Sequence, residues 1–292
     1  MTSAGRAGLG WGFFGVALFA LTVPLTRSVI DHMSPIFITA GRAVIAAIIA
    51  GAFLFFRRQP IPNRRLFLRM IAIGGGVVIG FPLFTGLALQ TVPASHAAVV
   101  VGLLPAATAV ISVLLTGERP PIRFWMFAAA GAVAVVLFTA TSHGGFAPLQ
   151  LEDLYLLAAV VVTAYGYADG AIVSREIGSW QTISWTLVLW SPALLAVTIW
   201  SLLSEPFTPD LTDWWAFAYL AAVSMYFAFF AWYRGLAIGP VSTVSQVQLT
   251  QPVMSIVWAA VILGETITPE IVLGGTIVIA CAALAVRSRL SR

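Results

Sequence analysis

The sequence is poor in charged residues and contains no lysine. Only 9% of its 292 residues are charged, all 15 basic residues are Arg, and 60% of the chain is hydrophobic. A soluble domain has about 25% charged and 45–50% apolar residues, so this chain cannot cover a water-facing surface of its size. The composition therefore excludes a soluble fold and predicts a protein that lies in the lipid bilayer.

The sequence also lacks the residues that metal, redox and catalytic sites need. Its single cysteine, Cys281, lies in an apolar run and allows no disulfide framework or thiolate metal site. Its histidines, His32, His96 and His143, are scattered near the ends of apolar segments, and no zinc-protease, nucleophile-elbow or phosphate-loop motif occurs. We therefore expect no catalytic residue, no metal and no cofactor.

Ten apolar segments separated by short polar breaks fill the chain. They cover residues 11–29, 36–56, 70–89, 94–115, 122–140, 154–172, 182–203, 214–237, 241–263 and 271–286. Each has about the length that a helix needs to cross the bilayer. The first could be a cleaved signal peptide, but its apolar run is too long for one, so we expect a retained helix. The pattern predicts an all-α polytopic membrane protein with ten transmembrane helices.

Basic and acidic residues alternate between successive loops. Every second loop is basic, with Arg57, Arg58, Arg64, Arg65 and Arg69 after the second segment, Arg119 and Arg123 after the fourth, Arg175 after the sixth, and Arg287, Arg289 and Arg292 after the tenth. The loops that alternate with these carry Asp and Glu. Basic loops stay in the cytoplasm, so we expect both termini to be cytoplasmic in a bacterial inner membrane. The net charge of +4 is explained by these membrane flanks, and we expect no nucleic-acid partner.

The chain repeats itself at a shift of 147 residues. Pro93, Ser95, Pro105 and the Gly-Glu pair at 117–118 recur as Pro240, Ser242, Pro252 and the Gly-Glu pair at 264–265. This predicts two halves, residues 1–147 and 148–292, with five helices each. Because five is odd, the second half enters the bilayer from the opposite side, as in inverted-repeat transporters.

Short motifs also recur in the two halves. Thr-Gly-Glu stands at 116–118 and Leu-Gly-Glu at 263–265, Gly-Leu-Ala-Leu at 86–89 and Gly-Leu-Ala-Ile at 235–238, and Arg42 lies early in the second segment. In order, spacing and duplication these motifs resemble the ten-helix EamA-type branch of the drug/metabolite transporter superfamily, over essentially the whole chain. Thr116 departs from the usual Leu. The aromatic-rich helices also resemble the aromatic amino-acid exporters of that branch.

The resemblance implies export of small metabolites by alternating access, along a path near the third, fourth, eighth and ninth helices. It implies no enzymatic activity, and we expect a monomer to be functional. An aromatic- and amide-lined path without a deep cluster of cations favours a zwitterion over a phosphorylated substrate. We therefore expect an amino acid with an apolar or aromatic side chain. The alternative is a multidrug or nucleoside exporter of the same fold.

Five prolines lie inside apolar segments, at Pro24, Pro82, Pro105, Pro192 and Pro252. We expect hinges or kinks at Pro24, Pro82, Pro105 and Pro252. A proline inside a helix leaves the carbonyl four residues earlier without its donor, and in lipid that carbonyl needs another partner. Pro105 and Pro252 are repeat mates near mid-helix. We therefore expect the carbonyls of Val101 and Gln248 to face the substrate path, although kinks that serve packing alone are the alternative.

Polar residues follow one face of the ninth segment, at 242, 245, 248, 251 and 255. Such residues line a cavity or hold helices together. We expect the substrate-binding residues to be Gln248, Ser245, Gln246, Tyr226, Phe81, Phe84, Thr85, Val101 and Tyr165.

Charged residues inside the segments are few. Asp169 could carry a proton, but a local ion pair with Arg175 is the competing interpretation, and Asp31 could pair with Arg42. Glu118 and Glu265 are expected to cap the helix that follows each of them.

Overall fold

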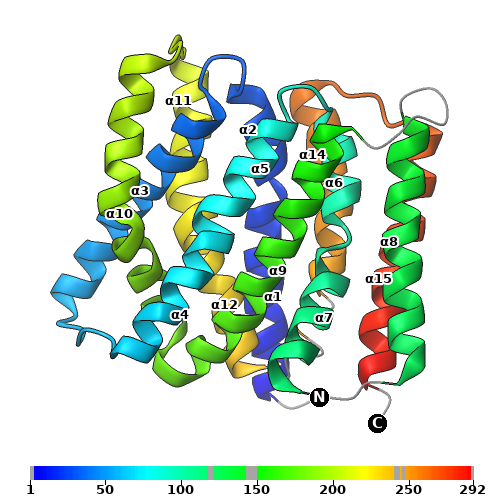
Figure 1. Ribbon diagram of the computed structural model, residues 1–292, viewed down its shortest axis with the longest axis horizontal. Coiled ribbons are helices and arrows are strands. Elements are labelled where there is room, and N and C mark those ends of the chain that lie inside the picture. The colour runs from blue at the N-terminus through cyan, green and yellow to red at the C-terminus, as the bar shows by residue number, and fades with distance from the viewer. Residues whose placement is uncertain (1–2, 118–120, 143–149, 240–243, 245–246, 291–292) are drawn as a thin grey trace.

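The computed structural model describes residues 3–117, 121–142, 150–239, 244 and 247–290, and every element in these ranges is helical. The helices run along one another in a single bundle, and both chain ends lie at the same end of it (Figure 1). The bundle therefore has the architecture of a polytopic membrane protein.

The first half makes five passes through the bundle. They are α1 (Ser3–Ala20) with α2 (Thr22–Val29), α3 (Pro35–Phe56), α4 (Arg64–Gly74) with the π-helix η1 (Gly75–Gly80) and α5 (Phe81–Ala88), α6 (Ala94–Val101) with α7 (Leu104–Thr116), and α8 (Ile122–Ser142).

The second half makes the same five passes. They are α9 (Leu151–Ile177), α10 (Ser179–Ser204), α11 (Leu211–Ala218) with the π-helix η2 (Tyr219–Phe227) and α12 (Ala228–Ile238), the short 3₁₀-helix η3 (Gln248–Thr250) with α14 (Gln251–Leu263), and α15 (Pro269–Leu290).

The ten predicted segments coincide with these ten passes. Eight helical stretches are long and apolar enough to cross a bilayer, and two shorter apolar stretches, Ile122–Phe138 and Gln248–Leu263, occupy the fifth and ninth passes over the described residues. The prediction of ten membrane helices is confirmed.

Helix boundaries repeat at the shift seen in the sequence. Both ends of α7 and α14 lie 147 residues apart, and so do the last residues of η1 and η2. The helices α7 and α14 also end alike, because Gly117 and Gly264 both adopt a left-handed backbone, with φ of 68° and 66°, which glycine tolerates best. The boundary between the halves stays a prediction, since residues 143–149 lie outside the described ranges.

The two halves run in opposite directions. Helix α1 begins beside the end of α12, where a Cβ atom on Gly8 would lie 2.6 Å from the Cα atom of Gly239. Helix α9 begins beside the start of α6, where His96 contacts Asp153. These contacts lie at opposite ends of the bundle, which confirms the inverted repeat.

The bundle has one basic and one acidic end. We call the end where α4, α8 and α10 begin the arginine end, because it carries Arg64, Arg65, Arg123 and Arg175. We call the other the acidic end, because it carries Asp31, Asp153, Glu205, Asp213 and Glu265. The two termini lie at the arginine end (Figure 1).

Close helix approach depends on glycine at the middle of the bundle. A Cβ atom on Gly76, in η1, would lie 2.3 Å from the carbonyl oxygen of Val162 on α9. No larger residue fits there without moving backbone. The Gly-Gly-Gly run thus serves helix packing, as its place in an apolar segment indicates.

Candidate transport site

Two symmetry-related helix breaks lie midway along the bundle. Helix α6 ends at Val101 and α7 begins at Leu104, and in the other half η3 leads into α14 at Gln251. Pro105 and Pro252 occupy the first turn of the new helices, where the missing N–H has no helical partner to lose. The prolines therefore start new helices after a break, whereas the sequence predicted kinks in continuous ones.

The helix break gives the carbonyl of Gln248, four residues before Pro252, a new hydrogen-bond donor. The Gln248 carbonyl accepts the N–H of Gln251 in the 3₁₀ turn, so the expectation of a fully freed carbonyl there is wrong. A carbonyl oxygen has two lone pairs, and one of them remains available. The tighter turn therefore compensates in part for the proline.

The side chain of Gln248 is the least satisfied polar group of this region. It is 2% exposed, and neither its Nε2 nor its Oε1 atom has a hydrogen-bond partner among the described residues. The Oε1 atom of Gln251, one turn further, also lacks one. Two buried amides beside a helix break therefore have polar atoms that no described residue satisfies.

The polar face of the ninth pass does not have a single role. Ser255 donates its hydroxyl to the carbonyl of Ala20 at 2.8 Å, which is the carbonyl that Pro24 leaves without a helical donor. Ser255 thus holds α14 to the break between α1 and α2. Ser245 and Gln246, two predicted substrate contacts, lie outside the described residues.

The π-helix η1 leads into a second irregular stretch at Pro82. The N–H of Phe81 bonds to the carbonyl of Gly76, five residues back, and Pro82 has no N–H to give. The hydroxyl of Thr85 donates to the Phe81 carbonyl at 2.5 Å, so this predicted substrate contact already has a partner on its own helix. Phe84 stacks on Tyr155 with ring centroids 6.2 Å apart, which places an aromatic pair beside this stretch.

The tyrosines of the eighth pass face three different neighbours. Tyr219 donates to the carbonyl of Leu18 on α1 at 3.0 Å, Tyr226 shares a 2.9 Å hydrogen bond with Ser184 on α10, and Tyr233 donates to α9. The seven-residue spacing puts them on one face only in a regular α-helix. The π-helix η2 adds a residue per turn and rotates that face. Tyr226, a predicted substrate contact, already has a hydrogen-bond partner in Ser184.

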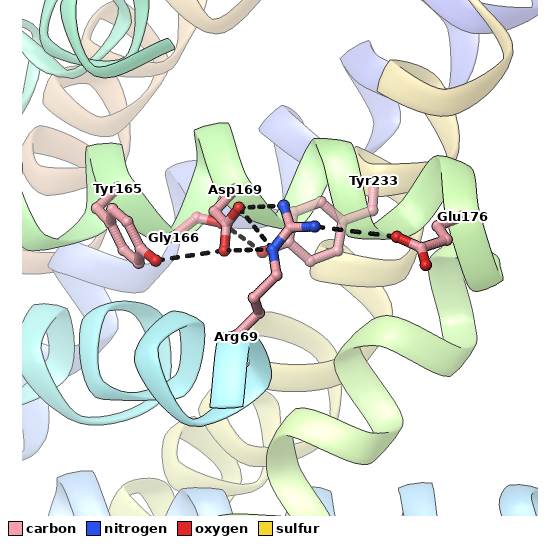
Figure 2. Close-up of polar contacts among 6 residues, drawn as sticks. All are labelled: Arg69, Tyr165, Gly166, Asp169, Glu176 and Tyr233. Carbon is pink, nitrogen blue, oxygen red and sulfur yellow. Dashed lines mark hydrogen bonds and ion pairs between the residues drawn. The ribbon is translucent and has the colours of Figure 1, made fainter. Parts of the chain in front are cut away.

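Asp169 lies in an ion-pair network at the arginine end (Figure 2). Its carboxylate accepts from the guanidinium of Arg69 on α4, through Nε at 3.1 Å and also through Nη2. Tyr165 donates to it at 3.3 Å, and Glu176 lies 3.9 Å from Arg69. The local ion pair is present, but its partner is Arg69. Arg175 instead points to the carbonyl of Leu236.

Asp31 forms an ion pair, but its partner is not the expected Arg42. Asp31 pairs with Arg27 one turn earlier at 3.0 Å, because both project from the same face of one helix end. Arg42 is 2% exposed and has no ion pair or hydrogen bond with any residue that the structure describes. The expected Asp31–Arg42 contact is therefore wrong.

Glu265 caps a helix of the opposite half. Its Oε1 accepts the N–H of Ala94 at 2.7 Å and its Oε2 that of Ser95 at 2.9 Å. Both donors belong to the first turn of α6, where N–H groups have no helical acceptor. The expectation that Glu265 caps the helix following it is wrong, and Glu118 lies outside the described residues. Close by, His96 contacts Asp153 at 3.0 Å, and both are buried.

Comparison with known proteins decides the class. A model of the EamA-like transporter family matches residues 6–140 and again residues 150–287. The chain belongs to the EamA-like transporter family. The uncharacterized transporter YdeK of Bacillus subtilis (strain 168) is 44% identical over 288 residues, which cover 95% of this chain and 97% of that protein. A protein of known crystal structure aligns with a TM-score of 0.68 at 22% identity, over 98% of this chain and 99% of the other.

The family makes this chain a multi-pass membrane transporter of a small molecule and not an enzyme. The structural likeness shows the fold alone. The names of these proteins give no substrate.

Sequence reasoning missed the contacts between the halves. Arg69 and Asp169 are 100 positions apart, and no sequence pattern around either residue predicts that they meet. A partial signal existed, because a carboxylate inside a span needs a cation and Arg69 begins a span at the same end as Asp169. No comparable sequence pattern predicts the two π-helices.

Proposed function

We propose that this EamA-like transporter exports amino acids with apolar or aromatic side chains across the bacterial inner membrane, by alternating access between its two halves. Both termini then lie in the cytoplasm, since the arginine end is the basic one, and one chain suffices. The substrate site lies at the paired helix breaks, around Gln248.

The observation that carries this proposal is the unpaired amide of Gln248. A buried polar group without a partner costs about 1–3 kcal/mol, and a bound ligand can recover that free energy. The carbonyl of such an amide can accept a hydrogen bond from the ammonium group of an amino acid. Its place at a helix break, repeated in the other half, suits a substrate that must be reached from both sides.

Aromatic residues of α5 and α9 favour an apolar side chain on the substrate. Phe81 and the stacked pair of Phe84 and Tyr155 belong to helices that flank the third-pass irregularity. A phosphorylated substrate needs several cations to hold it. The flat, half-buried Phe84–Tyr155 pair also suits a planar ring, which keeps a nucleoside or planar drug as the second candidate.

Transport by purified protein in liposomes tests the proposal. Labelled L-phenylalanine should be taken up in counterflow, and Gln248→Leu should raise its KM roughly 10- to 150-fold, as expected for losing a hydrogen bond to a charged group. Gln181→Leu is the matched control, because Gln181 also has a buried Oε1 without a partner but lies at the start of α10.

Two results contradict the proposal. Normal phenylalanine uptake by the Gln248→Leu protein removes Gln248 from the site. No phenylalanine uptake, together with uptake of a labelled nucleoside or cationic dye, favours the second candidate. The monodisperse fraction of each variant, measured in parallel, separates loss of transport from loss of folding.

A further inference from the structure

Arg42 is a buried cation without a counter-ion. Its side chain is among the largest fully buried ones and 2% exposed, and its Nε atom has no partner. The guanidinium stays protonated at any physiological pH. A buried charge left without a partner is strongly destabilising, so something outside the described protein should compensate it.

Five described carboxylates near the acidic end are engaged by other residues, and no ion pair among the described residues includes Arg42. Their partners are Arg27 for Asp31, His32 for Asp213, His96 for Asp153, Ser34 and Ser201 for Glu205, and the first turn of α6 for Glu265. None of these ion pairs or hydrogen bonds includes Arg42. The protein therefore supplies no anion to it in the part that the structure describes.

The position of Arg42 follows from the packing of α3 on α5. A Cβ atom on Gly86 would lie 3.2 Å from the Cβ atom of Pro35, so Pro35 marks the stripe of α3 that faces α5. Arg42 lies on that stripe seven residues further, about 10 Å deeper into the bundle. Because the two helices are antiparallel, this depth is level with the end of η1 and with Pro82.

A second unpaired polar group lies on the same stripe. Thr39 is buried, at 4% exposure, and its hydroxyl has no hydrogen-bond partner among the described residues. Thr39 and Arg42 are three residues apart and so are neighbours on the helix surface. Together they offer a planar guanidinium fork and a hydroxyl, which is the donor set that a carboxylate accepts best.

We infer that Arg42, with Thr39, binds the carboxylate of the transported substrate. The inference rests on the proposed function and narrows it to small monocarboxylates that carry an apolar group. One guanidinium balances one carboxylate, whereas a phosphate monoester brings about two negative charges, and neither α3 nor the stretch from η1 to α5 contains a second basic residue. Cationic drugs are excluded by the same charge.

Ligand analogues test this on the unchanged protein. Uptake of labelled L-phenylalanine into liposomes is measured with 3-phenylpropionate, which lacks the amine, and with phenethylamine, which lacks the carboxylate. The first should compete and the second should not. The same compounds are tested for protection against thermal unfolding in detergent, a readout that needs no transport.

Substitutions locate the effect. Arg42→Gln should raise the KM for phenylalanine at least tenfold and abolish protection by 3-phenylpropionate, and Arg42→Lys should fall between it and the parent, since it keeps the charge but loses the fork. Arg27→Gln is the control, because Arg27 is half exposed and already paired. If Arg42→Gln is not monodisperse, the analogue series on the parent protein still decides.

The outcomes separate this inference from the proposed function. If phenylalanine is not transported but 3-phenylpropionate protects the parent and not Arg42→Gln, the amino-acid proposal fails and the carboxylate site stands. If phenylalanine is transported and phenethylamine competes equally, the carboxylate site is overturned and the amino-acid proposal stands. Equal protection by chloride or inorganic phosphate also overturns it, because the site then accepts any anion.

Discussion

Removing the carboxylate of Glu265 should loosen the start of α6. In the structure its two oxygens each accept one backbone N–H, from Ala94 and Ser95. Both of these residues are buried, so water reaches their N–H groups poorly. Glu265→Ala therefore leaves two donors unpaired at a helix N-terminus, where a negative charge is also favourable.

The size of the effect follows from the two bonds. A hydrogen bond to a charged group contributes about 1.5–3 kcal/mol, and Glu265 itself is half-buried, so some water can replace it. We expect Glu265→Ala to lower the free energy of unfolding by about 2–4 kcal/mol. Glu265→Gln keeps one acceptor oxygen and should lose about half of that.

Denaturant titration of the purified protein in detergent micelles measures these values. Glu270→Ala is the control, because Glu270 lies in the same loop region but is exposed and caps no helix of the other half. Equal unfolding free energies for the Glu265→Ala and Glu270→Ala proteins would refute the reasoning. A Gln variant as unstable as the Ala variant would show that charge, and not the number of acceptors, decides the effect.

Two further predictions concern topology and coupling. In a Cys281→Ser background, a membrane-impermeant thiol reagent added outside cells should label a cysteine at position 145 and spare one at position 63, and the reverse pattern would place the termini outside. Asp169→Asn should lower the free energy of unfolding by about 1–3 kcal/mol, between the values for exposed and buried ion pairs, because Arg69 loses its main partner. If a pH gradient drives transport by the parent protein, it should also drive transport by this variant, and loss of that response would make Asp169 the proton carrier.

The passes through the membrane could be predicted from the sequence because each depends on its own residues. Apolar length located the helices, and Gly117 and Gly264 end two of them. Pro24 and Pro252 lie in the first turn of a new helix, where the sequence predicted kinks in continuous helices. The distinction depends on whether a neighbouring chain segment, such as Ser255 for Pro24, supplies the missing donor.

The site was harder to predict because its contacts join distant segments. Sequence neighbours made Arg175 the natural partner of Asp169, and only the packing of α4 on α9 brings Arg69 closer. The same holds for Glu265 and α6. The π-helix η2 rotates the face of the eighth pass, so the even spacing of Tyr219, Tyr226 and Tyr233 does not give them a common neighbour.

The π-helices determine which mutations can remove polar groups from the middle of the bundle. Where a helix returns from five-residue to four-residue hydrogen bonding, one carbonyl is left without a donor in its own ladder, and Pro82 adds another after η1. The residues of η1 are Gly-Gly-Val-Val-Ile-Gly, and none of them has a polar side chain. The polarity that η1 offers is therefore that of its main chain, and alanine scanning does not test it. Deletion of a single residue in either π-helix, which restores regular α-helical bonding, is the change that removes it.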